Sequence, residues 1–522
     1  MAIFLTCFSS FGMIITKQRY TEKKRESKMR RRDFIKSAGA FSAWAGLFYG
    51  RAFAVPHATC STGRPNLTIG MISDIHVRGV IKNGEWRYTY HDLFRRALEW
   101  FRDQGVDAVS VSGDMTEYGF IKEMEKVGET WFSVFPDNKA PDGRRVEPLF
   151  VTGNHDFEGY RYRYKKGKKF FGDKLNDHIV AADFEGVWKR VFGEDFYPVW
   201  HKEVKGYTFV GANWMSAKCL GKNEKGAAHA AQWFKANASL IGREKPFFYL
   251  QHPPVKNTAH GSWLWGYDNG LVGAELAAFD NAIAVTGHSH ASLSLEKAIW
   301  QDKFVSIDAG SLKYTGLHYS DTAPIYREND TLAASGEDRS KRVMKPIDVA
   351  DGHQGMLVRV YDDRIVFERR DFEDMSVLGP DWVLPLNRKG EKPFAFAPRA
   401  SSSKAPEFAP DAKLTAAIKS AKRKKTVVKA LEVVIPPVGP GGGRVFDYEI
   451  EISGSNGETD RKYVIAEGFN RSRNSQKANS PTVLLVALDA LKAAGNLNIK
   501  VFARNSFNKG GKPIQVTQFN DV

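Results

Sequence analysis

The 522-residue sequence is poor in cysteine, with three in all: Cys7, Cys60 and Cys219. So few cysteines exclude a scaffold held together by several disulfides, and whether Cys60 and Cys219 pair is left open. The sequence also lacks an uninterrupted apolar run of about 20 residues, the length that a membrane-spanning helix needs. We therefore predict no stable membrane span in the mature protein.

The sequence has no strong excess of charge of one sign outside its first residues. The formal net charge is +16, and residues 1–54, with 11 Lys and Arg and 3 Asp and Glu, carry +8 of it. The other +8 is spread over the rest of the chain, which is modest for that length and argues against dedicated nucleic-acid binding. A content of 42% hydrophobic and 12% aromatic residues is typical of a globular protein.

The first 54 residues have the three parts of an export signal. A basic stretch, Arg30 to Lys36, precedes a weakly apolar run from Ala38 to Tyr49 and the small-x-small sequence Ala52-Phe53-Ala54. The Arg31-Arg32-x-Phe-Ile-Lys part resembles a twin-arginine signal. It implies export by the twin-arginine machinery and a periplasmic or otherwise exported location in a bacterial cell envelope.

Two interpretations of residues 1–28 stay open. Met29 is a plausible start of translation, in which case the preceding residues are not part of the protein. Alternatively, Ala2 to Thr16 forms a membrane anchor, although it is shorter than the ~20 residues that span a bilayer.

Polar side chains with metal-binding chemistry follow five apolar, strand-like runs. Residues two apart in an extended chain project from the same face, so Asp74 and His76, and again His288 and His290, can each reach one point. Functional sites of α/β sheets lie outside the carboxyl ends of the strands, so we expect all five ends to converge. The seven candidate metal ligands are Asp74, His76, Asp114, Asn154, His252, His288 and His290.

The ligand types in this set indicate hydrolytic metal chemistry. Carboxylates, imidazoles and an amide oxygen, without cysteine, suit Mg, Mn, Fe or Zn and argue against an iron–sulfur or closed thiolate site. Two cations about 3.5 to 4 Å apart can clamp a phosphoryl group and lower the pKa of a bound water to about 7. We therefore predict two divalent or trivalent metal ions and attack by a metal-bound hydroxide. Each residue taken alone would more often be a cap or a solvated loop residue.

The order of these motifs resembles the calcineurin-like metallophosphoesterase family over about residues 65 to 372. The motifs are Asp74-Ile75-His76, Gly113-Asp114, Gly153-Asn154-His155-Asp156, His252 and Gly287-His288-Ser289-His290. The resemblance implies that one metal takes Asp74, His76 and His290. It implies that the other takes Asn154, His252 and His288, and that Asp114 bridges both.

The same resemblance implies that His155 is not a ligand but contacts the substrate phosphate or protonates the leaving oxygen. Many relatives carry Asp three residues after the bridging carboxylate to orient this histidine. Here that position is Glu117, and we expect its longer carboxylate to do the same. Related purple acid phosphatases have a tyrosine ligand there, so Glu117 argues against a purple di-iron centre.

The alternation of strands and helices predicts an α/β domain over residues 65–385. A helix is expected around Phe94 to Phe101, ending at Gly105, and another around Ala227 to Leu240. Met356 to Phe372 reads as a hairpin that closes the second sheet. The family resemblance sharpens this to a four-layer αββα sandwich.

We expect residues 386–425 to be a linker and residues 426–522 to be a small all-β domain. The pattern resembles a β-sandwich of the fibronectin type III or immunoglobulin-like kind. It contains no ligand cluster, which favours a packing or spacer module over an independent binding site. The expected strands are Leu431 to Ile435, Phe446 to Ile452, Lys462 to Ala466, Thr482 to Leu488 and Leu497 to Ala503.

The sequence thus predicts an exported two-metal enzyme, a phosphatase or phosphodiesterase, acting on phosphate monoesters or diesters. The alternative is a non-catalytic cell-surface binding protein with a vestigial metal site.

Overall fold

The computed structural model describes most of the chain after residue 62. The chain divides into two units, residues 1–62 and 63–522, and the described residues all belong to the second. The predicted export signal and all three cysteines lie outside them. In the described part, no helix is long and apolar enough to cross a membrane. The described ranges are 63–163, 178–215, 229–259, 268, 270–320, 323–324, 345–349, 352–387, 390–423, 426–439, 443–466, 469 and 480–517.

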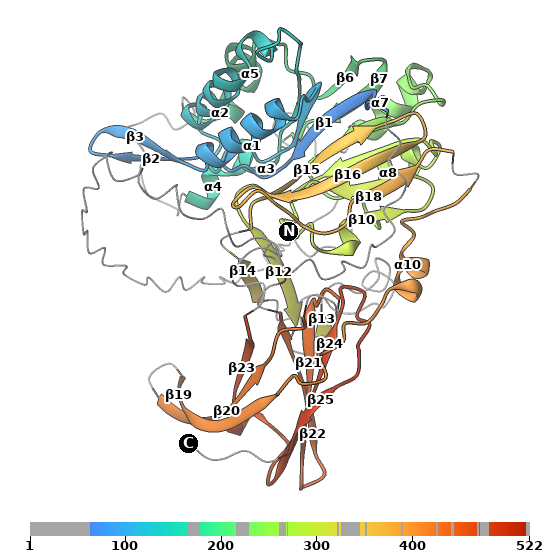
Figure 1. The fold of residues 1–522 in the computed structure, drawn as a ribbon. Coiled ribbons are helices and arrows are strands. Elements are labelled where there is room, and N and C mark those ends of the chain that lie inside the picture. The colour runs from blue at the N-terminus through green and yellow to red at the C-terminus, as the bar shows by residue number, and fades with distance from the viewer. Residues whose placement is uncertain are drawn as a thin grey trace, which may run out of the picture. The chain divides into compact units, whose positions relative to one another are not determined.

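The first large sheet has seven strands and begins with the run that precedes Asp74. Its order is β17-β16-β15-β1-β4-β5, with β18 paired to β16. Figure 1 shows the neighbouring strands β1, β15, β16 and β18 side by side. β1 and β4, and β4 and β5, are parallel, so their carboxyl ends lie at one edge. The strands are β1 (Leu67–Ile72), β4 (Ala108–Ser112), β5 (Glu147–Val151), β15 (Gln354–Val360), β16 (Arg364–Asp371), β17 (Ser376–Val377) and β18 (Trp382–Pro385).

The predicted hairpin is present as β15 and β16, but its place in the fold differs from the prediction. β15 pairs antiparallel with β1, from Leu67 opposite Val360 to Met71 opposite Met356. The hairpin therefore extends the sheet that contains β1 and does not close the second sheet. Alternating apolar residues predicted the strands but carried no information on which distant edge they would pair with.

The second large sheet has six strands in the order β10-β11-β9-β8-β7-β6. Its inner strands β7, β8, β9 and β11 are parallel, so His252 and the His288–His290 segment leave it at the same edge. The strands are β6 (Val199–Val204), β7 (Tyr207–Ala212), β8 (Phe247–Leu250), β9 (Ala282–Thr286), β10 (Ile299–Gln301) and β11 (Val305–Asp308).

Three apolar cores hold these elements together. One joins inward-facing residues of both sheets, such as Ile69, Phe209 and Phe248. A second joins the first sheet to α1, α2 and α5, and a third joins the second sheet to α7 and α8. The helices are α1 (His91–Asp103), α2 (Ile121–Val134), α3 (Asn154–Glu158), α4 (Tyr160–Arg163), α5 (Phe184–Phe192), α7 (Ala230–Asn237) and α8 (Leu271–Leu276).

The first predicted helix is α1, whose buried side chains are the four apolar residues that set its period. The described part of the second predicted helix is α7. Gly105, with φ 72°, follows the end of α1. Two small sheets complete this region: β2 (Arg78–Lys82) with β3 (Glu85–Thr89), and β12 (Thr315–Ser320) with β13 (Ala323–Pro324) and β14 (Lys345–Val349).

The C-terminal region is all-β, and each of the five predicted strands is present. They form two sheets, β19-β20-β23 and β22-β21-β24-β25, around one apolar core. The strands are β19 (Thr415–Arg423), β20 (Thr426–Ile435), β21 (Asp447–Gly454), β22 (Thr459–Ile465), β23 (Thr482–Ala487), β24 (Leu497–Arg504) and β25 (Ile514–Val516).

The predicted linker, residues 386–425, is not free of secondary structure. It contains α10 (Phe396–Ser402) and β19, which pairs with β20 from Thr415 opposite Val434 to Arg423 opposite Thr426. The all-β region therefore starts by Thr415 rather than at residue 426. β19 was missed because it is built mainly of Ala, Lys, Ser and Thr and lacks a strong apolar alternation.

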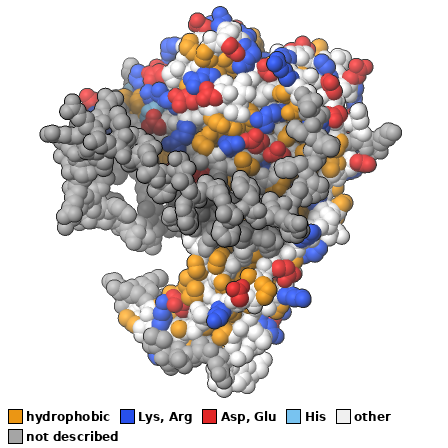
Figure 2. Space-filling model, in the orientation of Figure 1, with side chains coloured by type: hydrophobic (Ala, Val, Ile, Leu, Met, Phe, Trp, Pro, Cys, Tyr) orange, Lys and Arg blue, Asp and Glu red, His pale blue; other side chains and the backbone are white. Residues whose placement is uncertain are grey.

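Charges of both signs are mixed on the visible face of the molecule (Figure 2). On the face shown in Figure 2, Lys and Arg side chains are interspersed with Asp and Glu. Exposed large hydrophobic residues include Val427 on β20 and Val483 and Leu485 on β23.

Phe248 tests the core between the two sheets. Its ring is fully buried and stacks on Phe209 with 5.1 Å between centroids. Phe248→Ala should lower the free energy of unfolding by about 3–5 kcal/mol, because it removes a large apolar group and leaves a cavity. Urea denaturation followed by circular dichroism measures this, with the 52% exposed Leu240 changed to Ala as the control. Equal losses in both variants would contradict this description of the core.

Candidate metal centre

The structure brings all seven predicted ligands together at the carboxyl ends of five strands. Asp74 and His76 follow β1, Asp114 follows β4, and Asn154 begins α3 just after β5. His252 follows β8, and His288 and His290 follow β9. The two large sheets therefore each supply part of one cluster.

Tight left-handed turns aim many of these side chains. Such backbone costs of order 1–3 kcal/mol per non-glycine residue, so it persists only where the surroundings hold it. Here the main-chain N–H of Asp74 donates to Gly113 O (3.0 Å) and that of His76 donates to Asp114 O (2.9 Å), which ties the loops after β1 and β4 together. The ligands with positive φ are Asp74 (51°), His76 (50°), Asp114 (50°), His288 (69°) and His290 (51°).

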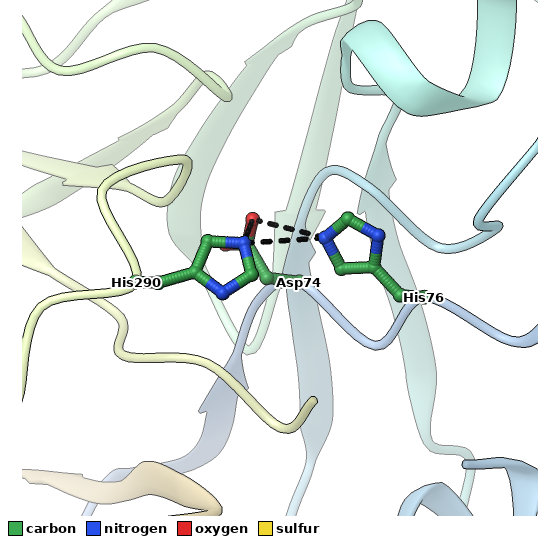
Figure 3. Close-up of side chains that lie close together, drawn as sticks. All are labelled: Asp74, His76 and His290. Atoms are coloured by element: carbon green, nitrogen blue, oxygen red, sulfur yellow. Dashed lines mark hydrogen bonds and ion pairs between the residues drawn. The ribbon is translucent and has the colours of Figure 1, made fainter. Parts of the chain in front are cut away.

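One group of ligand atoms is formed by Asp74, His76 and His290 (Figure 3). His290 Nε2 lies 3.0 Å from Asp74 Oδ1 and 3.2 Å from His76 Nε2. His76 Nε2 lies 3.7 Å from Asp74 Oδ1. Three potential ligand atoms thus face one point from two different sheets.

The second group is formed by Asp114, His252 and His288, with Asn154 beside it. His252 Nε2 lies 3.2 Å from Asp114 Oδ2, 3.2 Å from His288 Nδ1 and 3.1 Å from Asn154 Oδ1. Asp114 Oδ2 is also 3.5 Å from His76 Nε2 of the first group. This one oxygen therefore lies between the two groups.

The chemistry of these atoms fits cations. Asp74 is fully buried, and its Oδ1 makes no well-formed hydrogen bond although His290 Nε2 is near. Ring nitrogens of two histidines face each other in both groups, an arrangement that neutral lone pairs alone would disfavour. Buried carboxylates, imidazoles and an amide oxygen are the ligands that Mg, Mn, Fe and Zn accept.

The electrostatics of the cluster also favour positive charge. Burial by itself would raise the pKa of Asp74, but His290 and His76 outweigh it and hold the pKa well below its usual value. Burial would lower the pKa of His252, but the Asp114 charge raises it to about 9. Burial, and the neighbouring His252 second, lower the pKa of His288 to about 4, so this ring stays neutral. Positive charge is thus favoured beside the two carboxylates, where bound cations would supply it.

Main-chain carbonyls fix the orientation of two candidate histidine ligands. His252 Nδ1 donates to Ser112 O (2.8 Å) and His290 Nδ1 donates to Tyr314 O (3.1 Å), which leaves each Nε2 free to face the cluster. Sequence reasoning could not find these partners, because any residue type can supply a carbonyl.

The structure places the Glu117 carboxylate differently from the prediction. Its Oε2 lies 3.1 Å from His76 Nδ1 and accepts a hydrogen bond from Lys313 Nζ (2.5 Å). Burial would raise the pKa of Glu117, but His76 and Lys313 lower it to about 2. The His155 ring instead donates through Nδ1 to the main-chain carbonyl of Glu117 (2.7 Å). Glu117 thus contacts His155 through its backbone, while its carboxylate faces His76.

Asp156, the last residue of the Gly153-Asn154-His155-Asp156 motif, ties two loops together. It is fully buried and accepts hydrogen bonds from the main-chain N–H groups of Gly153 and Thr116, each at 2.8 Å. Burial first, and the Asp114 charge second, raise its pKa to about 6.

The contact of Lys313 with Glu117 was not predicted from the sequence. Lys313 lies far from the motifs in the sequence, and no recognisable pattern surrounds it.

Two glycines in the motifs are required by close approach. A Cβ at Gly153 would lie 2.2 Å from Asp114 Oδ1, and one at Gly113, where φ is 96°, would lie 2.4 Å from His252 Nδ1. Any other residue at these two positions would displace a ligand.

Glu117→Gln tests the contact with His76. Removing the negative charge while keeping the shape should weaken metal binding about 10- to 100-fold, because His76 loses the partner that orients its ring. Competition with a chromophoric chelator measures this affinity. The matched control is Glu85→Gln, an exposed carboxylate paired with Arg87 on β3. An affinity within twofold of the unmodified protein would show that Glu117 does not support the ligand.

Comparisons with known proteins identify the region. Residues 67–292 match the model of the calcineurin-like phosphoesterase family. No curated protein matches the chain. Among solved structures, a dimetal phosphatase from Danio rerio is similar, with 16% identity and a TM-score of 0.33, over 62% of this chain and 99% of that one. A purple acid phosphatase from yellow lupin (Lupinus luteus) seeds is also similar, with 12% identity and a TM-score of 0.36, over 62% and 55% of the two chains.

The matched segment contains all seven converging side chains as well as Glu117 and His155. Residues 67–292 of this chain are therefore similar to the calcineurin-like phosphoesterase family.

Proposed function

We propose that this protein is an exported phosphoesterase that hydrolyses phosphate monoesters or diesters with two metal ions. The position of Asp114 carries the proposal. Its Oδ2 is 3.2 Å from His252 Nε2 and 3.5 Å from His76 Nε2, so one carboxylate can bind a cation in each group. Asp74, His76 and His290 would hold one ion, and Asn154, His252 and His288 the other.

The metals can be Mn, Fe, Zn or Mg. Bound at this site, they would polarise a phosphoryl group and lower the pKa of a water molecule, which are the two requirements for ester hydrolysis near neutral pH. The chain's own residues must then hold the ions, place the substrate and manage the proton of the leaving group.

We propose that His155 protonates the leaving oxygen or contacts the phosphate oxygens of the substrate. Its main-chain N–H donates to Asp114 Oδ1 (2.8 Å) and its Nδ1 donates to Glu117 O (2.7 Å). The first bond holds the backbone of His155 beside the Asp114 carboxylate, and the second orients its ring at the edge of the metal centre. Burial lowers the pKa of His155, so its protonated form, the acid, is most available at acidic pH.

The proposal includes the wider organisation of the chain. The two large sheets would pack face to face between helices as a four-layer sandwich within residues 65–385, which the shared cores support. The C-terminal strands would form a sandwich of the fibronectin type III or immunoglobulin-like kind. The twin-arginine-like signal in residues 1–54 supports export to the periplasm.

The alternative function is non-catalytic binding at the cell surface with a vestigial metal site. The complete ligand set, together with a fixed histidine beside it, favours catalysis.

A substrate panel separates these functions. Protein reconstituted with Mn, Fe, Zn or Mg in turn should hydrolyse p-nitrophenyl phosphate, bis-p-nitrophenyl phosphate or both, and a chelator should abolish the activity. Asp114→Asn, prepared in the same way, controls for contaminating phosphatases and should lose the activity. Metal binding without hydrolysis of any ester would favour the binding protein.

His155→Ala tests the proton role. The variant should keep both metals but turn over about 10² to 10⁴ more slowly, because it lacks a positioned acid. The loss should be greatest for alkyl phosphates, whose leaving alkoxide needs a proton, and smallest for p-nitrophenyl phosphate. The advantage of the unmodified protein on alkyl esters should shrink as the pH rises. These rates, measured by phosphate release, should not change in His201→Ala, which alters an exposed histidine on β6. A deficit independent of the leaving group would remove His155 as the acid.

A further inference from the structure

The segment that follows His290 belongs to two cores at once. Leu293 packs in the core between the two large sheets. Ala291, two residues before it, and Leu295, two residues after it, are fully buried in the core of the C-terminal strands, with residues such as Leu431 and Ile450. The side chains of this short stretch therefore contribute to the core of the metallophosphoesterase domain and to that of the C-terminal domain.

Arg444 of the C-terminal region adds a polar connection to the same segment. Its Nη2 donates to Ser294 Oγ (2.5 Å) and to Phe469 O (2.8 Å), and its Nη1 donates to Leu378 O beyond β17. The guanidinium also lies over the Phe469 ring. One side chain thus joins the segment after His290, the end of the first sheet and the C-terminal domain.

Glu296 anchors the far end of the segment. Its main-chain N–H donates to Ser506 Oγ of the C-terminal domain (3.4 Å), and its carboxylate binds Arg369 and Arg399. Burial would raise the pKa of Glu296, but these two arginines lower it. The carboxylate therefore stays ionised and keeps both partners.

The near end of the segment is the candidate metal ligand. His290 has φ 51°, a conformation that must be held in place, and Ala291 is the next residue. The ring is oriented by Tyr314 O, and Leu293 N–H donates to Gln354 Oε1 (2.7 Å). These contacts fix one side of the segment, and the C-terminal domain covers the other.

We infer that the C-terminal β-domain is part of the scaffold of the metal centre, with Arg444 as a positioning residue that acts on His290 through Ser294. The sequence had predicted a packing or spacer module. Separation of the two domains would expose Ala291 and Leu295 and release the strained backbone of His290. The metal part of this inference depends on the proposed function, whereas the backbone part does not.

Hydrogen–deuterium exchange of the full-length, metal-free protein tests the backbone part. In Arg444→Ala, peptides covering residues 287–296 should exchange at least tenfold faster, while peptides over β1 and β8 keep their protection. Ser294→Ala is the second variant, which removes only the acceptor and should show the same local change to a smaller degree. Arg461→Ala is the matched control, because its 63% exposed side chain pairs only with Glu449 and Glu451 among the described ion pairs.

The metal part is tested on manganese-reconstituted protein by electron paramagnetic resonance. Unmodified protein should show the coupled spectrum of two ions, and Arg444→Ala should lose the ion held by His290 first and show the spectrum of a single ion. Arg444→Lys, which keeps a positively charged N–H donor group, should restore part of the coupled spectrum. If unmodified protein binds no metal, the proposed function is wrong. The exchange experiment uses metal-free protein, so it still tests the backbone part of the inference. Unchanged exchange over residues 287–296 in both variants, or equal acceleration throughout the chain, would overturn the inference.

Discussion

The buried carboxylate of Asp114 is the point on which the centre depends. One oxygen lies between the two groups of ligand atoms, and the other accepts the main-chain N–H of His155. Its own main-chain carbonyl accepts from His76, so the loops after β1, β4 and β5 all meet at this residue. The carboxylates of Asp74 and Asp114 are both ionised and buried close together. Burial of two negative charges costs free energy unless positive charge lies beside them.

The fold supplies that arrangement by backbone geometry rather than by long flexible side chains. Left-handed turns directly after buried strands point Asp74, Asp114 and His288 inward, and glycines let neighbouring loops come within contact distance. The side chains that then complete the site come from elsewhere. Lys313 pairs with Glu117 from the loop after β11, and the segment after His290 is covered by the C-terminal domain. The site is therefore a joint product of both large sheets and of the β-domain.

The convergence of the candidate ligands was predictable from the sequence, because metal chemistry restricts residue types and strand ends are marked by apolar runs. α1 was predictable because its apolar residues repeat at the helical period. The pairing of β15 with β1 was not, since a strand pattern does not name its partner. β19 gave too weak a pattern, and the turn of the Glu117 carboxylate toward His76 depends on a lysine almost two hundred residues away. The pairing of distant strands and the orientation of a side chain by a distant residue arise only in the folded chain.

The central claim is that Asp114 is shared by two metal ions. Crystals of manganese-reconstituted protein, measured for anomalous scattering at the manganese edge, test it most directly. The account predicts two peaks about 3.5 to 4 Å apart on either side of the Asp114 carboxylate, one beside Asp74 and His290 and the other beside Asn154 and His252. A single peak, or two peaks of which one lies away from Asp114, would contradict it.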